Sequence, residues 1–223
     1  MSPEPLRRLD ERPLLKDHPL ALRLSLALWI LGGFLFVALA IPILAERVQL
    51  VDDWVYRLAI ALETPFAVSL AKVLDFIGSS WVTAPAIFLV AGYLAWRRRW
   101  EAFGFWVLAM VMSQLLVGPV KAIYERARPP FPLVETTGYS FPSGHSVAGA
   151  AVAISLVIVL IPAGSRRRNW EMLAALFAVC MALSRVYLRA HWLSDVTAGA
   201  ALGAAVAIAS AAFIHWFDAR RNG

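Results

Sequence analysis

Three groups of polar residues carry the side chains that could do chemistry, and each borders an apolar stretch of the 223-residue sequence. The groups are residues 121–128, residues 142–145 and residues 184–195. Together they contain lysine, arginine, serine, histidine and aspartate side chains. Cations beside imidazoles and hydroxyls suit the binding and transfer of an anionic group such as phosphate.

In the third group, Asp195 follows His191 by four residues, which is about one helical turn. If a helix begins near His191, the carboxylate can accept one imidazole N–H, fix the tautomer and leave the other ring nitrogen nucleophilic. Arg185 lies six residues before His191, so the chain must turn between them for both to reach one ligand. The alternative is structural: His191 and Asp195 form a hydrogen bond at a helix start, and Arg185 binds lipid headgroups.

In the first group, Lys121 and Arg128 are seven residues apart. They would share one face of a helix that continued to the Arg128-Pro129 break, and their long side chains would then close on one anion. The alternative is that both cations bind lipid headgroups at the membrane surface.

The second group, Pro142-Ser143-Gly144-His145, stands directly before an apolar stretch and predicts the start of a helix. Ser143 is a good N-cap, and the free N–H groups of a first helical turn attract anions. Gly144 lets an oxyanion approach the backbone closely. Capping alone would explain Ser143, but it does not explain the neighbouring His145.

These residue types fit phosphoryl transfer, in which negative charge spreads over three equatorial oxygens while nucleophile and leaving group lie in line. The cations would supply positive charge, and Ser143 with the Gly144 amide would supply neutral donors. His191, oriented by Asp195, would attack phosphorus, and His145 would protonate the leaving oxygen and then activate water. We expect no metal and no cofactor, because the cations take the electrostatic role and the sequence offers no carboxylate cluster beside them.

The elements that position these groups must lie in a membrane, because 60% of the residues are hydrophobic and only 16% are charged. We predict an all-α protein with a bundle of six transmembrane helices at residues 24–45, 76–96, 102–120, 146–165, 170–184 and 196–214. Residues 46–75 are too charged to span. Apolar residues at helical spacing there predict an extra amphipathic helix in the outer membrane interface, followed by a short apolar piece that dips into the bilayer. The predicted division is a tail at 1–23, a membrane domain at 24–217 and a tail at 218–223.

The basic residues predict the orientation of the bundle. Thirteen of the 21 Lys and Arg residues fall at residues 1–23, 97–99, 166–168 and 220–221. The positive-inside rule then places both termini in the cytoplasm and all three polar groups at the outer face. The net charge of +6 reflects this topology and not nucleic-acid binding, because no basic stripe is interleaved with aromatic residues. The single cysteine, Cys180, excludes an internal disulfide.

The three groups also resemble the signature of a known family. Residues 121–129 match K-x6-R-P, residues 142–145 match P-S-G-H, and residues 184–195 match S-R-x5-H-x3-D. In this order they resemble the three motifs of the type 2 phosphatidic acid phosphatases, the PAP2 superfamily. That family includes lipid phosphate phosphatases, bacterial acid phosphatases and vanadium haloperoxidases, and the six-span layout extends the resemblance to most of the chain.

The resemblance implies a role for each matching residue. His191 would be the nucleophile, His145 the acid and base, and Asp195 the residue that orients His191. The residues implied to hold phosphate are Lys121, Arg128, Ser143, Gly144 and Arg185. Membrane members of the family remove phosphate from lipids such as phosphatidic acid, phosphatidylglycerophosphate and undecaprenyl diphosphate. The soluble members lack spans, which argues against a haloperoxidase.

The prediction is therefore a metal-independent lipid phosphate phosphatase in a bacterial inner (plasma) membrane, whose partners are its lipid substrate and the bilayer. The alternative from another class is a transporter, or a protein that binds lipid phosphates without catalysis. A transporter would be expected to place ionisable residues in the middle of its spans, where this sequence has none. The identity of the lipid, the choice between monophosphate and diphosphate, and the oligomeric state stay open.

Overall fold

The computed structural model describes residue 14 and residues 18–222, and the regular structure within them is entirely helical. The helices are α1 (His18–Ala40), α2 (Pro42–Ala61), α3 (Pro65–Gly78), α4 (Ser80–Trp96), α5 (Trp100–Tyr124), α6 (Gly144–Leu160), α7 (Ser165–Tyr187) and α8 (Leu193–Asn222). The predicted all-α class is confirmed for this part of the chain.

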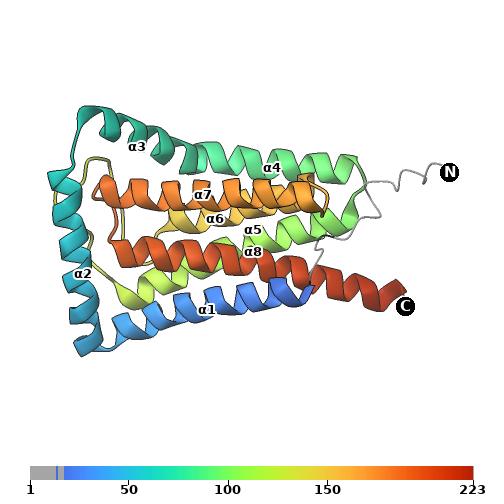
Figure 1. The fold of residues 1–223 in the computed structure, drawn as a ribbon, viewed down its shortest axis with the longest axis horizontal. Helices are drawn as coiled ribbons and strands as arrows, with labels where there is room; N and C mark the ends of the chain where they lie inside the picture. Colours follow the sequence, from blue (N-terminus) through green and yellow to red (C-terminus); the bar gives the residue numbers. More distant parts are fainter. Residues whose placement is uncertain (1–13, 15–17, 223) are drawn as a thin grey trace.

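The helix α2 lies across one end of the molecule, whereas the other helices run roughly along its long axis (Figure 1). We call this end the α2 end. The connections α5–α6 and α7–α8 also lie there, while α1 begins and α8 finishes at the opposite end (Figure 1). The three polar groups lie in or beside those two connections, so the fold gathers them at the α2 end.

The central helices α6 and α8 pack with their backbones in contact, and two glycines make this possible. A Cβ atom at Gly203 would lie 2.2 Å from the Val147 carbonyl oxygen, and one at Gly199 would lie 2.7 Å from the Ser143 carbonyl oxygen. A larger residue at either position would therefore force the helices apart. The close packing sets the two helix N-termini side by side, where the Ser143 N–H donates to the Asp195 carbonyl at 3.1 Å.

Four helices among the described residues are long and apolar enough to cross a membrane, and they are α1, α5, α7 and α8. The helices α3 and α4 meet the same criterion as a pair bent by 43°, which is either one broken span or a re-entrant loop. The helix α6 is apolar but has only 17 residues. Helices therefore lie at all six predicted positions, while six crossings remain a prediction.

Several predicted boundaries are wrong, and proline explains two of them. The helix expected to run to residue 45 ends at Ala40, because Pro42 occupies the first turn of α2. The helix expected to run to residue 165 ends at Leu160, two residues before Pro162. The span predicted from residue 76 starts at Ser80, since residues 76–78 finish α3.

The last two spans are longer than predicted. The helix expected at 170–184 extends from Ser165 to Tyr187, so residues 166–168, which were expected between two spans, lie in the first turn of α7. The helix expected at 196–214 extends from Leu193 to Asn222, so residues 218–222 are helical where the sequence suggested a tail. Residues 18–23 belong to α1, and the rest of the predicted N-terminal tail, apart from residue 14, lies outside the described residues.

A helix, α2, is present where the amphipathic helix was predicted after the first span. One of its charged side chains, Asp52, points into the molecule. Asp52 is 2% exposed, whereas the neighbouring Leu50, Val51 and Trp54 are each more than half exposed. A buried carboxylate requires polar partners inside the molecule. The place of α2 in the membrane interface stays a prediction.

Candidate active site

The turn expected between Arg185 and His191 is present at the end of α7. The N–H groups of Ala190 and His191 both donate to the Arg185 carbonyl, at 3.0 and 3.2 Å. The next helix begins at Leu193, and the Trp192 N–H donates to Asp195 Oδ2 at 2.9 Å. His191 therefore lies just before α8, between the end of one long helix and the start of another.

The His191 ring lies between a carboxylate and a guanidinium. Its Nδ1 is 3.6 Å from Asp195 Oδ2, and its Nε2 is 3.1 Å from Arg128 Nη1. A guanidinium can only donate, so Nε2 carries the lone pair and Nδ1 carries the proton, which faces Asp195 and the Ser140 hydroxyl. Burial lowers the pKa of His191 to about 4, although Asp195 opposes the shift. The ring is therefore neutral at neutral pH, and its unprotonated nitrogen, Nε2, accepts a hydrogen bond from Arg128.

Lys121 and Arg128 do not share a helix face, and this expectation was wrong. The helix α5 ends at Tyr124, and Glu125 adopts a left-handed conformation with φ of 43°. A helix that continued to Arg128 would also place the residue before Pro129 in the conformation that proline disfavours.

The two cations nevertheless converge, because both donate to the Tyr139 carbonyl oxygen. Arg128 also donates to the backbone carbonyls of Thr137, Gly138 and Ala190, at 2.7, 2.9 and 2.8 Å. Burial lowers the pKa of Arg128, and Asp195 opposes this shift. The loop 137–139 thus holds this guanidinium through main-chain atoms alone.

The Pro142 to His145 group forms the start of α6 as predicted. The helix begins at Gly144, and the Ser143 hydroxyl accepts a hydrogen bond from the Ser146 N–H at 3.4 Å. Ser143 is fully buried. The contact with Asp195 places this helix start beside the start of α8, so the amides around Gly144 lie near the His191 group.

His145 and Arg185 are joined by a residue that the motifs do not include. Asp75, on α3, has its Oδ1 3.3 Å from His145 Nε2, and the same oxygen contacts Arg185 Nη1. Asp75 thereby connects His145 and Arg185, as the Tyr139 carbonyl connects Lys121 and Arg128. The one signal for Asp75 in the sequence is a carboxylate within an otherwise largely apolar segment.

Arg126 is a second residue that the sequence reasoning missed. Its Nη1 is 2.6 Å from Asp195 Oδ1, and its Nη2 is 2.7 Å from Asp52 Oδ2 on α2. It lies between Lys121 and Arg128, and nothing in its sequence neighbourhood points to an acid 74 residues earlier. Among the residues that the structure describes, no three His, Cys, Asp or Glu side chains are grouped to hold a metal ion.

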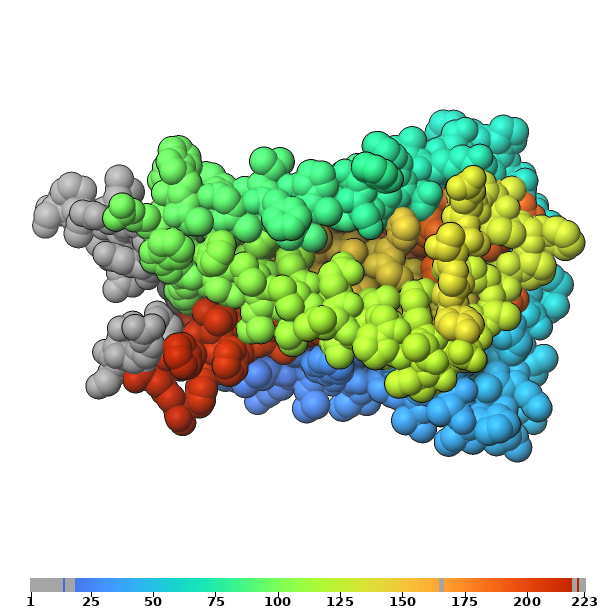
Figure 2. All heavy atoms as spheres, turned by 180° about the vertical axis from the view of Figure 1, so that it is seen from behind, coloured from blue at the N-terminus to red at the C-terminus, as the bar shows by residue number. Residues whose placement is uncertain are grey.

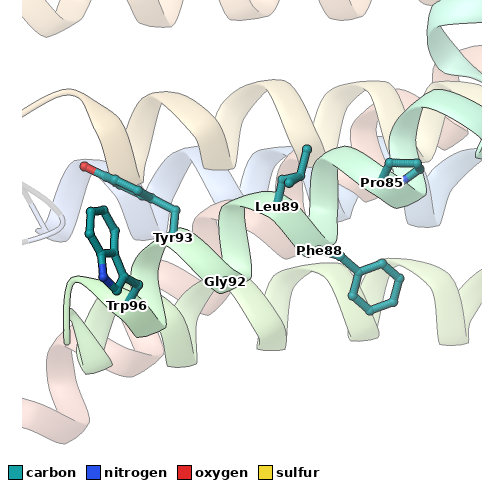
Figure 3. Close-up of a pocket in the computed structure, with 6 residues that line it drawn as sticks. All are labelled: Pro85, Phe88, Leu89, Gly92, Tyr93 and Trp96. Atoms are coloured by element: carbon teal, nitrogen blue, oxygen red, sulfur yellow. The ribbon is translucent and has the colours of Figure 1, made fainter.

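A shallow hollow of about 650 Å³ on α4 is a different kind of surface (Figure 3). Its lining comes from this helix alone: Pro85, Phe88, Leu89, Gly92, Tyr93 and Trp96. Phe88 and Leu89 are both more than 70% exposed, and no charged side chain lines the hollow. It is an exposed, largely apolar surface whose lining residues include no cation that could hold phosphate.

The bundle of long apolar helices defines an integral membrane protein, and its gathered cations lie next to a neutral histidine. A family model agrees with this class: the PAP2 superfamily matches residues 101–219. The chain belongs to the PAP2 superfamily and is a phosphatase of that superfamily.

Relatives and solved structures support the assignment over most of the chain. The chain is 32% identical to phosphatidylglycerophosphatase B of Bacillus subtilis over 174 residues, which is 75% of this chain and 85% of the relative. It is 29% identical to an undecaprenyl-diphosphatase of Sulfolobus acidocaldarius over 138 residues, or 58% of this chain and 61% of the relative.

Two crystal structures share the fold. The transmembrane PAP2-type phosphatidylglycerolphosphate phosphatase from Bacillus subtilis superposes with a TM-score of 0.74 at 28% identity, covering 88% of this chain and 96% of the other. LpxE from Aquifex aeolicus gives a TM-score of 0.58 at 22% identity, covering 70% and 91%. The second likeness concerns the fold only.

Proposed function

We propose that this protein is a metal-independent lipid phosphate phosphatase that works through a phosphohistidine at the outer membrane face. The observation that carries the proposal is the setting of His191. Arg128 donates to Nε2 at 3.1 Å, which shows that Nε2 is the unprotonated ring nitrogen. Asp195 faces the other ring nitrogen, Nδ1. The arrangement resembles the carboxylate–histidine pairs that orient an imidazole for catalysis.

In the proposed first step, His191 Nε2 forms a bond to phosphorus while the bond from phosphorus to the lipid oxygen breaks. His145 gives a proton to the leaving oxygen. The His191 ring keeps its Nδ1 proton and becomes cationic, and Asp195 stabilises that charge. The oxyanion charge is held by Lys121, Arg128 and Arg185.

In the second step, water attacks phosphorus and His145 takes a proton from that water. The bond between phosphorus and Nε2 breaks, the electron pair returns to Nε2, and inorganic phosphate leaves. His145 is then protonated again and ready to act as the acid. Each step balances without a metal ion or another reactant.

A lipid substrate is supported by an apolar cavity of about 410 Å³ between α3–α4, α6 and α7. Gly78 and Met181 line it, and a Cβ atom at Gly78 would lie 2.9 Å from His145 Cδ2, so one end of the cavity adjoins His145. Behind the bundle, α6 lies in a recess between α4 and α5 (Figure 2). An acyl or prenyl chain in the cavity would bring its phosphate to the cations. The Bacillus and Sulfolobus relatives, whose names specify lipid phosphates, point to the same substrate class.

Orientation at the outer face is supported by the distribution of basic residues. The α4–α5 connection contains Arg97, Arg98 and Arg99 and lies at the end opposite α2 (Figure 1). The positive-inside rule favours the cytoplasm for that end, and hence the outer face for the α2 end. A bacterial inner membrane is the corresponding location.

The proposal is tested with purified protein and a panel of lipid phosphates that includes phosphatidic acid, phosphatidylglycerophosphate and undecaprenyl diphosphate. We expect phosphate release that vanadate inhibits and that EDTA leaves unchanged, together with an acid-labile phosphoenzyme. Binding of these lipids without phosphate release would favour the binding or transport alternative. Loss of activity with EDTA and recovery with Mg²⁺ would show that the histidine mechanism is wrong.

A further inference from the structure

The buried Asp52 of α2 joins that helix to the start of α8. Its Oδ1 accepts a hydrogen bond from the Ser194 N–H at 2.9 Å, and its Oδ2 accepts one from the Ser194 hydroxyl at 2.6 Å. The Asp52 side chain is 1% exposed. An aspartate at a helix N-terminus satisfies a free N–H and interacts favourably with the helix dipole, so these contacts fix α2 onto α8.

Arg126 lies between Asp52 and Asp195. Its Nη2 donates to Asp52 at 2.7 Å and to Gln49 at 2.8 Å, while its Nη1 donates to Asp195 Oδ1 and to the Ser194 hydroxyl, both at 2.6 Å. Only 12% of its side chain is exposed. The guanidinium is therefore shared by two buried carboxylates, one of which faces His191.

Asp52, Arg126, Asp195 and His191 form a row of side chains in which each contacts the next, and the charges along this row affect the reaction. With His191 neutral, Asp52, Arg126 and Asp195 together carry one net negative charge in buried surroundings. When His191 becomes cationic on phosphorylation, the side chains of the row become neutral overall. Without the charge of Asp52, the Arg126 guanidinium would act on Asp195 alone and would weaken the negative potential that Asp195 presents to the cationic ring of His191.

We propose that Asp52 and Arg126 are positioning residues for the phosphorylation of His191, with Asp52 supplying the negative charge that lets Asp195 act on His191 while it is bound to Arg126. The inference rests on the proposed phosphohistidine mechanism. It assigns a catalytic contribution to α2, which lies outside the three motifs.

The test compares Asp52→Asn with Asp53→Asn, a control that removes the same charge from the adjacent residue. Asp53 accepts a hydrogen bond from the Gln49 side chain, and the oxygen of an asparagine at this position can accept the same bond. We expect Asp52→Asn to slow phosphoenzyme formation and kcat by about 10- to 100-fold, as for residues that act through an oriented neighbour. Inhibition by vanadate should change less than about threefold, because the phosphate-binding cations are untouched. Asp53→Asn should match wild type.

The double variant Asp52→Asn/Arg126→Gln separates charge from simple structural support. Removing both partners restores one net negative charge on Asp195, so phosphoenzyme formation should recover at least several-fold over Asp52→Asn alone. A purely structural network would instead give a double variant no faster than the single one. If Asp52→Asn fails to fold, as judged by size-exclusion chromatography, the double variant is compared with wild type instead. It keeps one net negative charge on Asp195, which still accepts hydrogen bonds from the Ser140 hydroxyl and the Trp192 N–H.

The phosphorylation rates and vanadate affinities of these variants test the role proposed for Asp52. Slow phosphorylation, unchanged vanadate affinity and recovery in the double variant support it. Wild-type rates in Asp52→Asn overturn it, as does an equal loss of vanadate affinity, or a folded double variant without recovery. A wild-type protein that forms no phosphoenzyme would instead overturn the proposed function itself, which keeps the two failures distinguishable.

Discussion

Asp75 Oδ1 lies 3.3 Å from His145 Nε2 and contacts Arg185 Nη1, so one carboxylate on α3 joins the predicted acid to a predicted phosphate ligand. A negative charge beside a cation repels an incoming oxyanion, yet the same carboxylate lies close enough to His145 Nε2 to orient the ring once that nitrogen is protonated. These two effects act in opposite directions on binding and on turnover.

Replacing Asp75 by Asn should therefore separate the two effects. We expect tighter inhibition by vanadate, by a few-fold, because Arg185 loses a competing anion, together with a kcat lower by about tenfold because His145 loses a restraint on its orientation. Steady-state kinetics with a vanadate titration measures both. Glu63→Gln, which removes an acid that pairs with Arg189 at 3.2 Å, is the control and should leave both values unchanged. Weaker vanadate inhibition in Asp75→Asn would contradict the predicted competition.

Substitutions of the two histidines should affect phosphoenzyme formation differently. His191→Ala should abolish both turnover and the acid-labile phosphoenzyme, because no nucleophile remains. His145→Ala should still form phosphoenzyme slowly from an activated aryl phosphate, whose leaving group needs no proton, since general acid–base help is typically worth about 10² to 10⁴-fold. Single-turnover assays with a labelled substrate distinguish the variants. Complete loss of the phosphoenzyme in both would argue against separate roles.

The lowered pKa of His191 predicts an acid limit to phosphorylation. Burial brings this pKa to about 4, so the neutral nucleophile persists until the pH approaches that value. We expect the rate of phosphoenzyme formation from an aryl phosphate to fall to half its maximum near pH 4, in stopped-flow or quench measurements. A midpoint near 6.5, the ordinary value for histidine, would contradict the burial effect.

The same shift bears on stability. Because the unfolded chain binds a proton at His191 more readily than the folded protein does, the unfolded state gains protons first as the pH falls from about 6.5 to about 4. This histidine therefore lowers stability with falling pH across that window, and the effect is absent above it.

The close contact between α6 and α8 predicts that one methyl group added at Gly203 lowers the stability of the fold. Gly203→Ala places a Cβ atom against the Val147 carbonyl and should lower the free energy of unfolding by about 1 to 3 kcal/mol, the usual cost of overpacking. Thermal unfolding in detergent measures this. Gly92→Ala is the matched control, because no atom lies within 4 Å of the added Cβ, and it should be neutral or slightly stabilising. Equal melting temperatures for the two variants would disprove the close contact.

The orientation in the membrane can be read by cysteine labelling. In a Cys180→Ala background, a cysteine at the exposed Glu135 should react with a membrane-impermeant maleimide in intact cells, because the loop 125–143 lies at the α2 end. A cysteine at the exposed Arg97 should react only after the cells are opened. The reverse pattern would invert the topology derived from the basic residues.

Features that depend on nearby residues were predictable from the sequence. The N-cap at Ser143, the turn between Arg185 and His191 and the helix α2 all follow from local rules for capping, chain reversal and amphipathic spacing. Each involves residues close together in the chain. The structure agrees with the sequence at all three.

Features that depend on distant partners were not predictable in this way. Arg126 lies just beyond the end of α5, and only the folded structure brings it to Asp52 and Asp195. Asp75 meets His145 and Arg185 across 70 and 110 residues, respectively. The predicted common helix face for Lys121 and Arg128 was wrong because the end of α5 is set by the fold of the loop, where the Ser140 N–H donates to the Arg126 carbonyl at 2.8 Å.

The partners of Arg128 in the loop are the carbonyl oxygens of Thr137, Gly138 and Tyr139. Every amino acid carries a carbonyl, so the anchor does not depend on which side chains the loop bears. We therefore expect Arg128 to keep these contacts when Glu135, Thr136 and Thr137 are exchanged in a mutant library, provided that the loop backbone keeps its path. Activity of such a library on several lipid phosphates tests whether this loop contributes to headgroup preference.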